Sequence, residues 1–238
     1  MKTVLSMGAR LGALALLAVA GMALVNPVGG SATAAGPPHE FTYVQSQHLE
    51  PASDAAVADL DGDGRQDLIL ADRTDIWRGP LLVRGNGTSY VSAIPLCASL
   101  PLATRGVAVA DFTDDGDQDV AVAADSGLFI LVGDGAGSVS QVQTIPMGVG
   151  LNKISTGDLD GDGRVDLACT RGNGRVVFIA LSGSDRSYST TIPVGLGGPS
   201  GQMYGLATGD VDGDGRDEVV ASSSQGTWLV SADSTSSI

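Results

Sequence analysis

The chain has 238 residues, a formal net charge of −14 from 27 acidic and 13 basic side chains, and only 4% aromatic residues. All but three of the acids are Asp, which favours caps and turns over helix interiors, so acidic helices are not expected. The negative balance excludes sequence-independent nucleic-acid binding, which needs Lys and Arg on phosphates. With 43% hydrophobic residues, the chain can form a packed core.

Residues 1–34 are predicted to be a secretory signal peptide. Lys2 and Arg10 form a basic start, residues 11–25 are an uninterrupted apolar run, and residues 32–34 (Ala-Thr-Ala) supply a small-x-small cleavage pattern. A membrane span needs about 20 apolar residues, so a retained membrane anchor is the weaker alternative. We therefore expect a secreted or extracytoplasmic protein with no membrane association after cleavage.

Four segments of nine residues repeat without gaps in the remainder of the chain. They begin at Asp59, Asp111, Asp158 and Asp210, and their starts are separated by 52, 47 and 52 residues. A short apolar run stands on each side of every segment, and such runs bounded by Gly and Asp are typical of strands. Four strands in a unit of about 50 residues match a β-propeller blade. The fold is therefore predicted to be all-β, with a short linker over 35–40 and a domain of four blades over 41–238.

The outer strands of the units are less regular. A third apolar stretch, ten residues beyond the last acid of each segment, is expected to place four residues at one register: Trp77, Phe129, Val176 and Trp228. The two Trp are predicted to belong to the core between blades. A fourth stretch with an Ile-Pro pair near its end occurs in the first three units but not in the last. We expect residues 41–49 to replace it and close the ring by pairing with residues 227–231; the alternative is a truncated longer propeller.

Each repeated segment has oxygen ligands at the spacing of a calcium loop. Acids stand at positions 1, 3, 5 and 9, except for Thr113 at position 3 of the second segment, and Gly at position 6 allows the positive φ of a tight curl. Ca²⁺ takes about six to eight oxygens, and position 7 can supply its backbone carbonyl. A polar hairpin with solvated carboxylates is the alternative, but clustered carboxylates repel one another. The predicted ligands of up to four structural Ca²⁺ are Asp59, Asp61, Asp63, Arg65, Asp67, Asp111, Thr113, Asp115, Asp117, Asp119, Asp158, Asp160, Asp162, Arg164, Asp166, Asp210, Asp212, Asp214, Arg216 and Glu218.

The first half of each segment matches an EF-hand loop, but the second half does not. An EF-hand needs a bidentate Glu at position 12 and flanking helices, whereas position 12 here is Leu70, Val122, Cys169 or Ala221.

The pattern Val-Ala-Asp-Leu-Asp-Gly-Asp-Gly-Arg-x-Asp-Leu instead resembles the FG-GAP/VCBS repeats of integrin-α-like β-propellers. This resemblance implies a calcium ion in a hairpin loop between the first two strands of each blade. The Phe-Gly and Gly-Ala-Pro ends of the integrin version are missing, which favours the VCBS-like branch.

The four predicted sites are not expected to be equal. The first and third segments are complete. Thr113 replaces a carboxylate with a hydroxyl in the second segment, and Glu218 ends the fourth with a longer side chain. We therefore expect the second segment to bind calcium most weakly.

Side chains suited to hydrolytic chemistry are sparse. His39 and His48 precede the repeats, so no His within the repeats is available for a Ser-His-Asp triad or a zinc site. Cys97 and Cys169 can pair in an oxidising compartment or remain free thiols.

We expect a calcium-binding adhesion or binding module, not an enzyme, whose partner is an extracellular protein or glycan. A lectin and an enzyme acting on extracellular polysaccharides are the alternatives.

Overall fold

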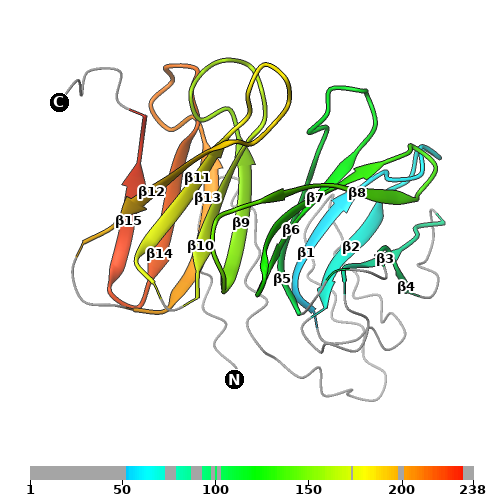
Figure 1. The fold of residues 1–238 in the computed structure, drawn as a ribbon, viewed down its shortest axis with the longest axis horizontal. Helices are drawn as coiled ribbons and strands as arrows, with labels where there is room; N and C mark the ends of the chain where they lie inside the picture. The colour runs from blue at the N-terminus through cyan, green and yellow to red at the C-terminus, as the bar shows by residue number, and fades with distance from the viewer. Residues whose placement is uncertain are drawn as a thin grey trace, which may run out of the picture.

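The computed structural model describes residues 52–72, 79–86, 93–97, 100, 103–172, 174–197 and 201–232. In these residues the strands form four small antiparallel sheets, arranged as the four blades of a β-propeller (Figure 1). The predicted all-β propeller is confirmed. Within the same ranges, no helix has the length and apolar character needed to cross a membrane.

In each sheet the strands are neighbours in chain order. The first blade contains β1 (Ala52–Ala58), β2 (Asp67–Asp72), β3 (Leu81–Val83) and β4 (Ile94–Pro95). The second contains β5 (Thr104–Ala110), β6 (Asp119–Ala124), β7 (Gly127–Gly133) and β8 (Val139–Ile145). The third contains β9 (Leu151–Gly157), β10 (Asp166–Arg171), β11 (Val176–Leu181) and β12 (Thr190–Gly195). The fourth contains β13 (Met203–Gly209), β14 (Glu218–Ser223) and β15 (Gly226–Val230).

The repeated segment is the loop between the first two strands of every blade. In the first blade, Ala58 at the end of β1 pairs with Asp67 at the start of β2. The same pairing joins position 9 of the other loops to the residue that precedes position 1. The strands predicted on both sides of each loop are therefore confirmed, and the loops close hairpins.

The third strands correct one predicted register. The residues that pair with position 12 of their units are Leu81, Phe129, Phe178 and Trp228. Val176 was expected at this register but begins β11, where it pairs with Gly195, and Trp77 lies outside the described residues. Counting ten residues from the last acid of the loop does not find equivalent residues in every blade, because the hairpins between the second and third strands differ in length.

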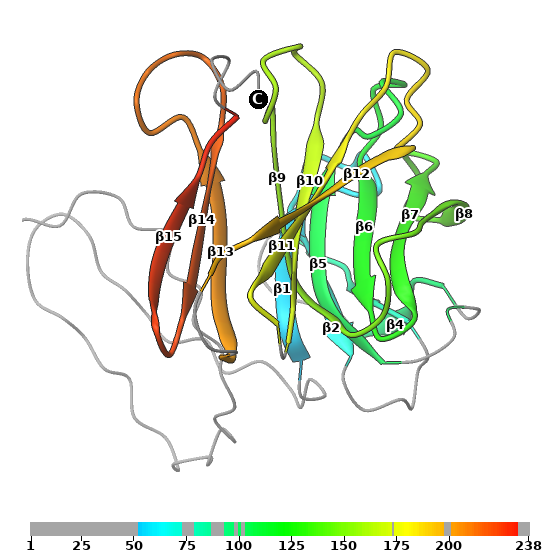
Figure 2. The same ribbon diagram turned by 60° about the vertical axis from the view of Figure 1, so that its left-hand side comes forward.

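The blades pack face to face through their innermost strands. β1 packs against β5, β5 against β9, and β9 against β13. Figure 1 shows the sheets following one another across the view, and in Figure 2 the first sheet lies behind the second. The second strands are rich in small apolar residues; β6, for example, reads Asp-Val-Ala-Val-Ala-Ala and is buried along its whole length. Small side chains allow neighbouring sheets to approach closely, so each blade is covered on the faces that meet its neighbours.

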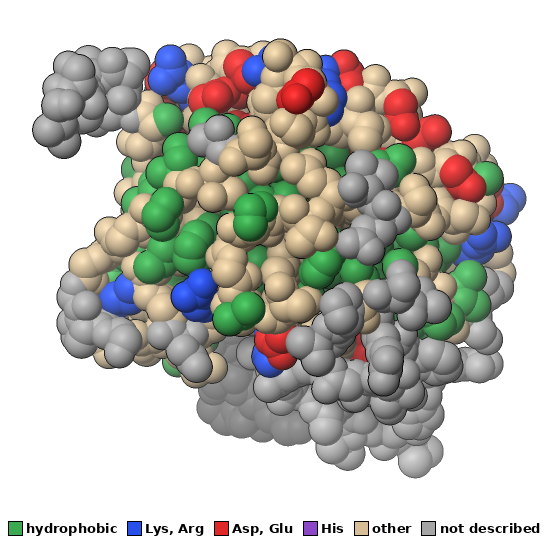
Figure 3. All heavy atoms as spheres, viewed as in Figure 1, with side chains coloured by type: hydrophobic (Ala, Val, Ile, Leu, Met, Phe, Trp, Pro, Cys, Tyr) green, Lys and Arg blue, Asp and Glu red, His purple; other side chains and the backbone are tan. Residues whose placement is uncertain are grey.

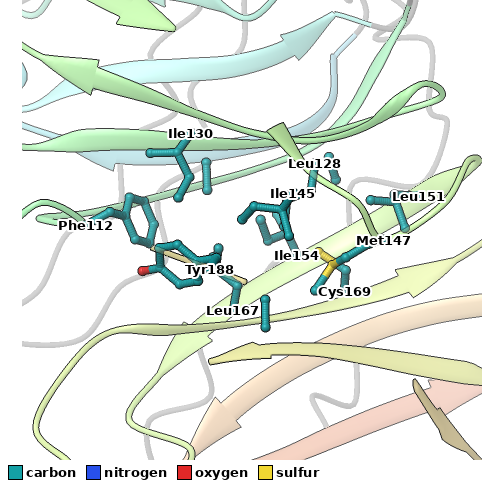
Figure 4. Close-up of a cluster of buried hydrophobic side chains, with 13 residues drawn as sticks. Phe112, Leu128, Ile130, Ile145, Met147, Leu151, Ile154, Leu167, Cys169 and Tyr188 are labelled. Carbon is teal, nitrogen blue, oxygen red and sulfur yellow. The ribbon is translucent and has the colours of Figure 1, made fainter. Parts of the chain in front are cut away.

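Separate apolar clusters fill the spaces between blades. The cluster between the second and third blades includes Phe112, Ile145, Leu167 and Tyr188 (Figure 4), and the rings of Phe112 and Tyr188 meet edge to face with centroids 6.3 Å apart. Aromatic pairs prefer this edge-to-face geometry. A second cluster joins the first and second blades, and a third joins the third and fourth. The core is therefore divided among the blade interfaces.

Trp228 and the two cysteines lie in or against these clusters. Trp228 packs against the cluster between the third and fourth blades, as expected for a residue of the inter-blade core. Cys169 is buried in the cluster between the second and third blades, whereas Cys97 packs against the one between the first and second. The structure does not join Cys97 and Cys169 in a disulfide. It therefore favours two separate thiols over the bridge that the sequence also allowed.

The predicted closing strand, residues 41–49, lies outside the described residues. In the described part of the chain, the fourth sheet ends at β15, which pairs with β14. Leu229 of β15 is 59% exposed, so this last sheet presents apolar surface to solvent. Closure of the ring by residues 41–49 stays a prediction.

Tyr188 provides a test of the core between the second and third blades. Its hydroxyl donates a hydrogen bond to the Val165 carbonyl oxygen at 2.5 Å, and burial raises the pKa of Tyr188 to about 12, so it is a neutral donor at physiological pH. Tyr188→Phe is expected to lower the free energy of unfolding by about 1–3 kcal/mol, because the part-buried hydrogen bond to the Val165 carbonyl is lost. Urea unfolding in excess calcium measures this. Tyr204→Phe, at a side chain that is 58% exposed, is the control and should change stability by less than about 0.5 kcal/mol. Equal losses in both variants would contradict the assignment.

Candidate metal centres

The first carboxylate of each repeated loop organises the loop around itself. Asp59 accepts hydrogen bonds from the backbone N–H groups of Asp63 and Gly64 at 3.1 and 2.8 Å. Position 1 of the second and third loops accepts hydrogen bonds from positions 5 and 6 in the same way, and in the fourth loop from positions 4 and 6. These hydrogen bonds hold the tight curl that the glycine pattern predicted.

Position 4 of every loop has a positive φ. Gly62, Gly161 and Gly213 have φ angles of 69°, 80° and 82°. Asp114 occupies this position in the second loop with a φ of 61°, in a region that Asp tolerates better than most residues with a Cβ. The second loop therefore keeps the backbone of the others while it places an additional carboxylate where they have glycine.

Position 9 is a buried carboxylate that joins three strands. The exposed fractions are 0% for the first three loops and 4% for the fourth, at Asp67, Asp119, Asp166 and Glu218. In the third blade, Asp166 Oδ2 accepts a hydrogen bond from the Leu159 N–H at 2.9 Å, and Oδ1 accepts one from the Ser182 N–H at 2.8 Å. Ser182 directly follows β11, and the first two blades have the equivalent pair of bonds. Position 9 therefore fixes the loop to the end of the third strand, a role that the spacing of the acids did not indicate.

Carboxylates of positions 1, 3 and 9 converge in three of the four loops. In each of these loops, one oxygen from every residue of the trio lies within 4.8 Å of the others. The trios are Asp59, Asp61 and Asp67; Asp158, Asp160 and Asp166; and Asp210, Asp212 and Glu218. Oxygens about 2.3–2.6 Å from one calcium ion lie at such separations. Three of the predicted sites therefore have a donor set that fits a hard divalent cation.

The second loop differs from the other three at position 3. Within the described ranges it does not form a convergent carboxylate trio, because Thr113 stands where the others have Asp. The Thr113 hydroxyl donates to Asp119 Oδ2 at 3.3 Å, and Asp114 pairs with Arg186 of the turn between β11 and β12. The expected weakness of this loop for calcium stays a prediction, and this geometry favours it.

Positions 5 and 7 are joined through the loop backbone. Asp63 Oδ1 accepts a hydrogen bond from the Arg65 N–H at 2.9 Å, and the other three loops have the same bond. In the first and third loops the Arg guanidinium also pairs with the carboxylate of position 5. The convergent trios form without position 5, so its ligand role and that of the position 7 carbonyl remain predictions.

Burial raises the pKa of the position 9 carboxylate in the second and third loops. Burial raises the pKa of Asp166 from 3.8 to about 6; backbone hydrogen bonds from Ser182 and Leu159 oppose this shift, and the carboxylates of Asp160 and Asp162 add to it. Burial also raises the pKa of Asp119. An anionic Asp166 is therefore costly without a cation beside it, and a bound metal would remove that cost.

The loops also contact neighbouring blades, through residues that motif comparison missed. Asp217, at position 8 of the fourth loop, donates its N–H to the Asp158 carbonyl oxygen at 2.7 Å. Its Oδ2 accepts the Asp158 N–H at 3.0 Å. Position 8 is Gln in the first two loops and Val in the third. The additional acid at position 8 of the fourth loop was therefore the only feature of the sequence that could have indicated this contact. Asp217 therefore couples the third and fourth repeated loops.

All four loops lie at one edge of the propeller. The innermost strands β1, β5, β9 and β13 each lead into a loop, and their ends point to the same side of the molecule (Figure 1). Asp and Glu side chains gather along the corresponding upper edge in Figure 3. The acidic residues that dominate the composition are therefore concentrated where the candidate metal centres are.

The chain belongs to the family of FG-GAP-like repeats. The family model matches residues 59–122, 111–169 and 158–221, which together cover more than half of the chain. Each match begins at the first acid of one loop and ends at position 12 of the next unit. The resemblance seen in the loop pattern is confirmed.

One of the similar solved structures supports the fold. A lectin from Agrocybe aegerita that recognises non-reducing terminal N-acetylglucosamine superposes with a TM-score of 0.51 and 16% identity, over 74% of this chain and 48% of the lectin chain. The chain therefore spans about half the length of that structure. The Photorhabdus luminescens Tc holotoxin pore matches with a TM-score of 0.43 and 19% identity, over 84% of this chain and 10% of the other. No curated protein gives a significant sequence match.

The second loop allows a direct test of the ligand set. Thr113→Asp supplies the missing carboxylate at position 3, so it should raise the calcium affinity of this loop by about tenfold, because each added carboxylate ligand strengthens a calcium site. Calorimetric titration should change from three tighter sites and one weaker site to four comparable ones. Thr113→Asn, which adds no charge, is the matched control. Four equal sites in the unmodified protein would contradict the proposed order.

Asp166 allows a test of proton competition. In calcium-free protein its raised pKa means that the folded state binds more protons than the unfolded state between about pH 4 and 6, so its contribution to stability falls as pH rises through that range. The free energy of unfolding of the unmodified protein, minus that of Asp166→Asn, should therefore decrease from pH 4 to 6 in EDTA. With calcium present the decrease should vanish, because the ion favours the carboxylate. A difference that rises with pH in EDTA would overturn the interpretation.

Proposed function

We propose that this protein is a secreted, calcium-stabilised β-propeller that acts as a binding or adhesion module. The observation that carries the calcium part is the convergence of three carboxylate oxygens within 4.8 Å in three separate loops. One such group on a protein surface is common without a metal. Three at equivalent positions of repeated hairpins, each including a buried carboxylate, are far more difficult to explain by surface charge alone.

The donor chemistry supports calcium over softer metals. The trios contain only carboxylate oxygens, which suit hard cations, and none of their members is His or Cys. Positions 1, 3 and 9 would hold the ion, with positions 5 and 7 as further ligands. When bound, calcium would neutralise the clustered carboxylates and tie the first hairpin of a blade together. Its role is proposed to be structural.

A binding role is favoured over hydrolysis by the acids outside the loops. An acid–base pair for glycoside hydrolysis needs two available carboxyl groups that flank the substrate. Among the described acids outside the loops, Asp125 makes a two-point ion pair with Arg105, and Asp54 lies 3.7 Å from the Lys153 ammonium. These two acids are engaged in holding the inner strands. Asp134 and Asp185 accept hydrogen bonds within their own exposed turns. These engagements support a non-enzymatic function.

The proposed partner is an extracellular protein or a glycan. Secretion rests on the predicted signal peptide over residues 1–34, and the polymer-directed enzyme is the alternative. A screen of the calcium-loaded protein against immobilised glycans and matrix proteins tests the binding role. Saturable binding of at least one partner supports it. Turnover of a polysaccharide by the purified protein would favour the enzyme instead.

Calcium dependence of stability tests the metal sites. An ion that binds only the folded state at ten times its dissociation constant adds about 1.4 kcal/mol per site, so EDTA should lower the melting temperature at neutral pH. Extracellular calcium modules bind at about 10⁻⁴–10⁻³ M, which sets the concentrations to use. Asp160→Asn should reduce the calcium-induced shift by removing one site. Asp185→Asn, in an exposed turn outside the loops, should leave that shift unchanged. Equal melting temperatures in EDTA and calcium would count directly against the sites.

A further inference from the structure

A polar pocket opens at the edge of the propeller opposite the metal loops. Ser53, Arg105 and Asn152 line it from equivalent positions of β1, β5 and β9, six residues before the first acid of each loop. Its volume is about 550 Å³. Small-molecule sites measure about 300–1,000 Å³. Because the innermost strands begin at this pocket and end at the metal loops, the two sites are separated by the length of a strand.

The charges around the pocket leave one guanidinium without an acid. Arg105 donates from Nε and Nη2 to the two oxygens of Asp125 at 2.5 and 2.9 Å. Arg171, which also lines the pocket, lies in ion-pair distance of no acid among the described residues. Its Nε is buried and lacks a hydrogen-bond partner in the same part of the chain. A buried donor of this kind is costly unless something fills the site, so the pocket has an uncompensated positive group.

The surroundings of Arg171 hold its side chain in place. The guanidinium carbon lies 5.1 Å from the centre of the Phe178 ring, which covers one face of the group. A side chain at Gly148, where φ is +82°, would collide with Arg171 Nη2, so the guanidinium also lies against the turn that leads to Gly150 on the pocket wall. A stacked, fixed guanidinium loses little freedom when it binds a planar anion, which favours recognition of a carboxylate.

The pocket is also a place where the four repeats differ. Arg171 is the last residue of β10, and the last residues of the other second strands are Asp72, Ala124 and Ser223. The metal loops keep nearly the same residues in every blade. Arg171 is therefore not part of the residue pattern that every blade needs in order to fold. It is available for a role that is specific to this site.

We propose that this pocket binds a small carboxylate-bearing polyol of the uronic acid class, either free or at the end of a glycan. The carboxylate would pair with Arg171. Two of the polar side chains that line the same pocket already donate to backbone carbonyls: Asn152 Nδ2 to Met203, and the Ser53 hydroxyl to Thr104 and Arg105. The Asn152 amide oxygen and the Ser53 hydroxyl oxygen can therefore accept hydrogen bonds from sugar hydroxyls, and the Gln202 amide can donate or accept them. The inference rests on the proposed binding role for its class of partner, but it concerns a site distinct from the calcium loops.

The test uses the full chain saturated with calcium. D-glucuronate is titrated into one sample and D-glucose into another, and binding is measured by NMR chemical shifts or by calorimetry. The two sugars differ in the carboxylate. Glucuronate should bind saturably and glucose at least about tenfold more weakly, because a charge-assisted hydrogen bond is lost. Failure of glucuronate to bind, or equal binding of both sugars, would overturn the proposal. Because calcium-induced stabilisation is measured separately, failure here would leave the proposed calcium sites untouched.

Variants assign the effect to Arg171. Arg171→Gln should weaken glucuronate binding by about 10- to 100-fold, and Arg171→Lys should retain part of it. Gln202→Glu, at an exposed residue of the pocket rim, adds a repelling charge without disturbing the core, so it should also weaken binding if Arg171→Gln does not fold. Arg186→Gln, at the opposite edge, is the control and should bind normally. Unchanged affinity in folded Arg171→Gln or in Gln202→Glu would contradict the assignment.

Methyl β-D-glucuronide separates the two sources of the ligand. Its capped anomeric oxygen imitates the end of a glycan chain. If it binds as well as glucuronate, the site accepts a glycan end. If free glucuronate alone binds, the ligand is a free sugar acid; both results support the pocket.

Discussion

Each blade buries a carboxylate at position 9 of its repeated loop, and the arrangement of the hairpin depends on this group. In the third blade, Asp166 takes one hydrogen bond from its own loop and one from the residue after the third strand. A buried acid is costly unless such donors reach it. The donors come from separate elements, so satisfying this one carboxylate positions the loop and the first three strands together. Burial raises the pKa of Asp166 to about 6, and the hydrogen bonds from Ser182 and Leu159 oppose that rise.

The same constraint explains the composition of the chain. Of the 27 acids, 18 lie in the four nine-residue loops, which contain only three Arg. A high negative charge can serve solubility or attract a basic partner. Here most of it is concentrated on one edge of the propeller, around buried carboxylates that repel one another. The acidity is therefore explained by the repeated loops, three of which bring carboxylates together in a way that fits the proposed cation sites.

The two edges of the propeller have different physical characters. At the loop edge, repetition of one nine-residue pattern builds similar sites in successive blades. At the opposite edge, the strands begin with different residues. The pocket there combines the Arg105–Asp125 ion pair with the guanidinium of Arg171, which pairs with no acid among the described residues. A repeat architecture permits this division, because each blade needs its core and its hairpin to fold but leaves strand ends free to vary.

The sequence by itself determined the repeat and the strands on both sides of each loop, because these depend on contacts within a few residues of chain. It marked the acids at positions 1, 3, 5 and 9 alike as ligands, and only the structure brought positions 1, 3 and 9 together in three of the loops. Thr113 already marked the second loop as different. Only the tertiary structure decided that Phe178, not Val176, is equivalent to Phe129, since hairpin lengths vary between blades. Contacts between blades, such as that of Asp217 with Asp158, also required it. Such contacts join residues far apart in sequence, and no local pattern encodes which of them will meet.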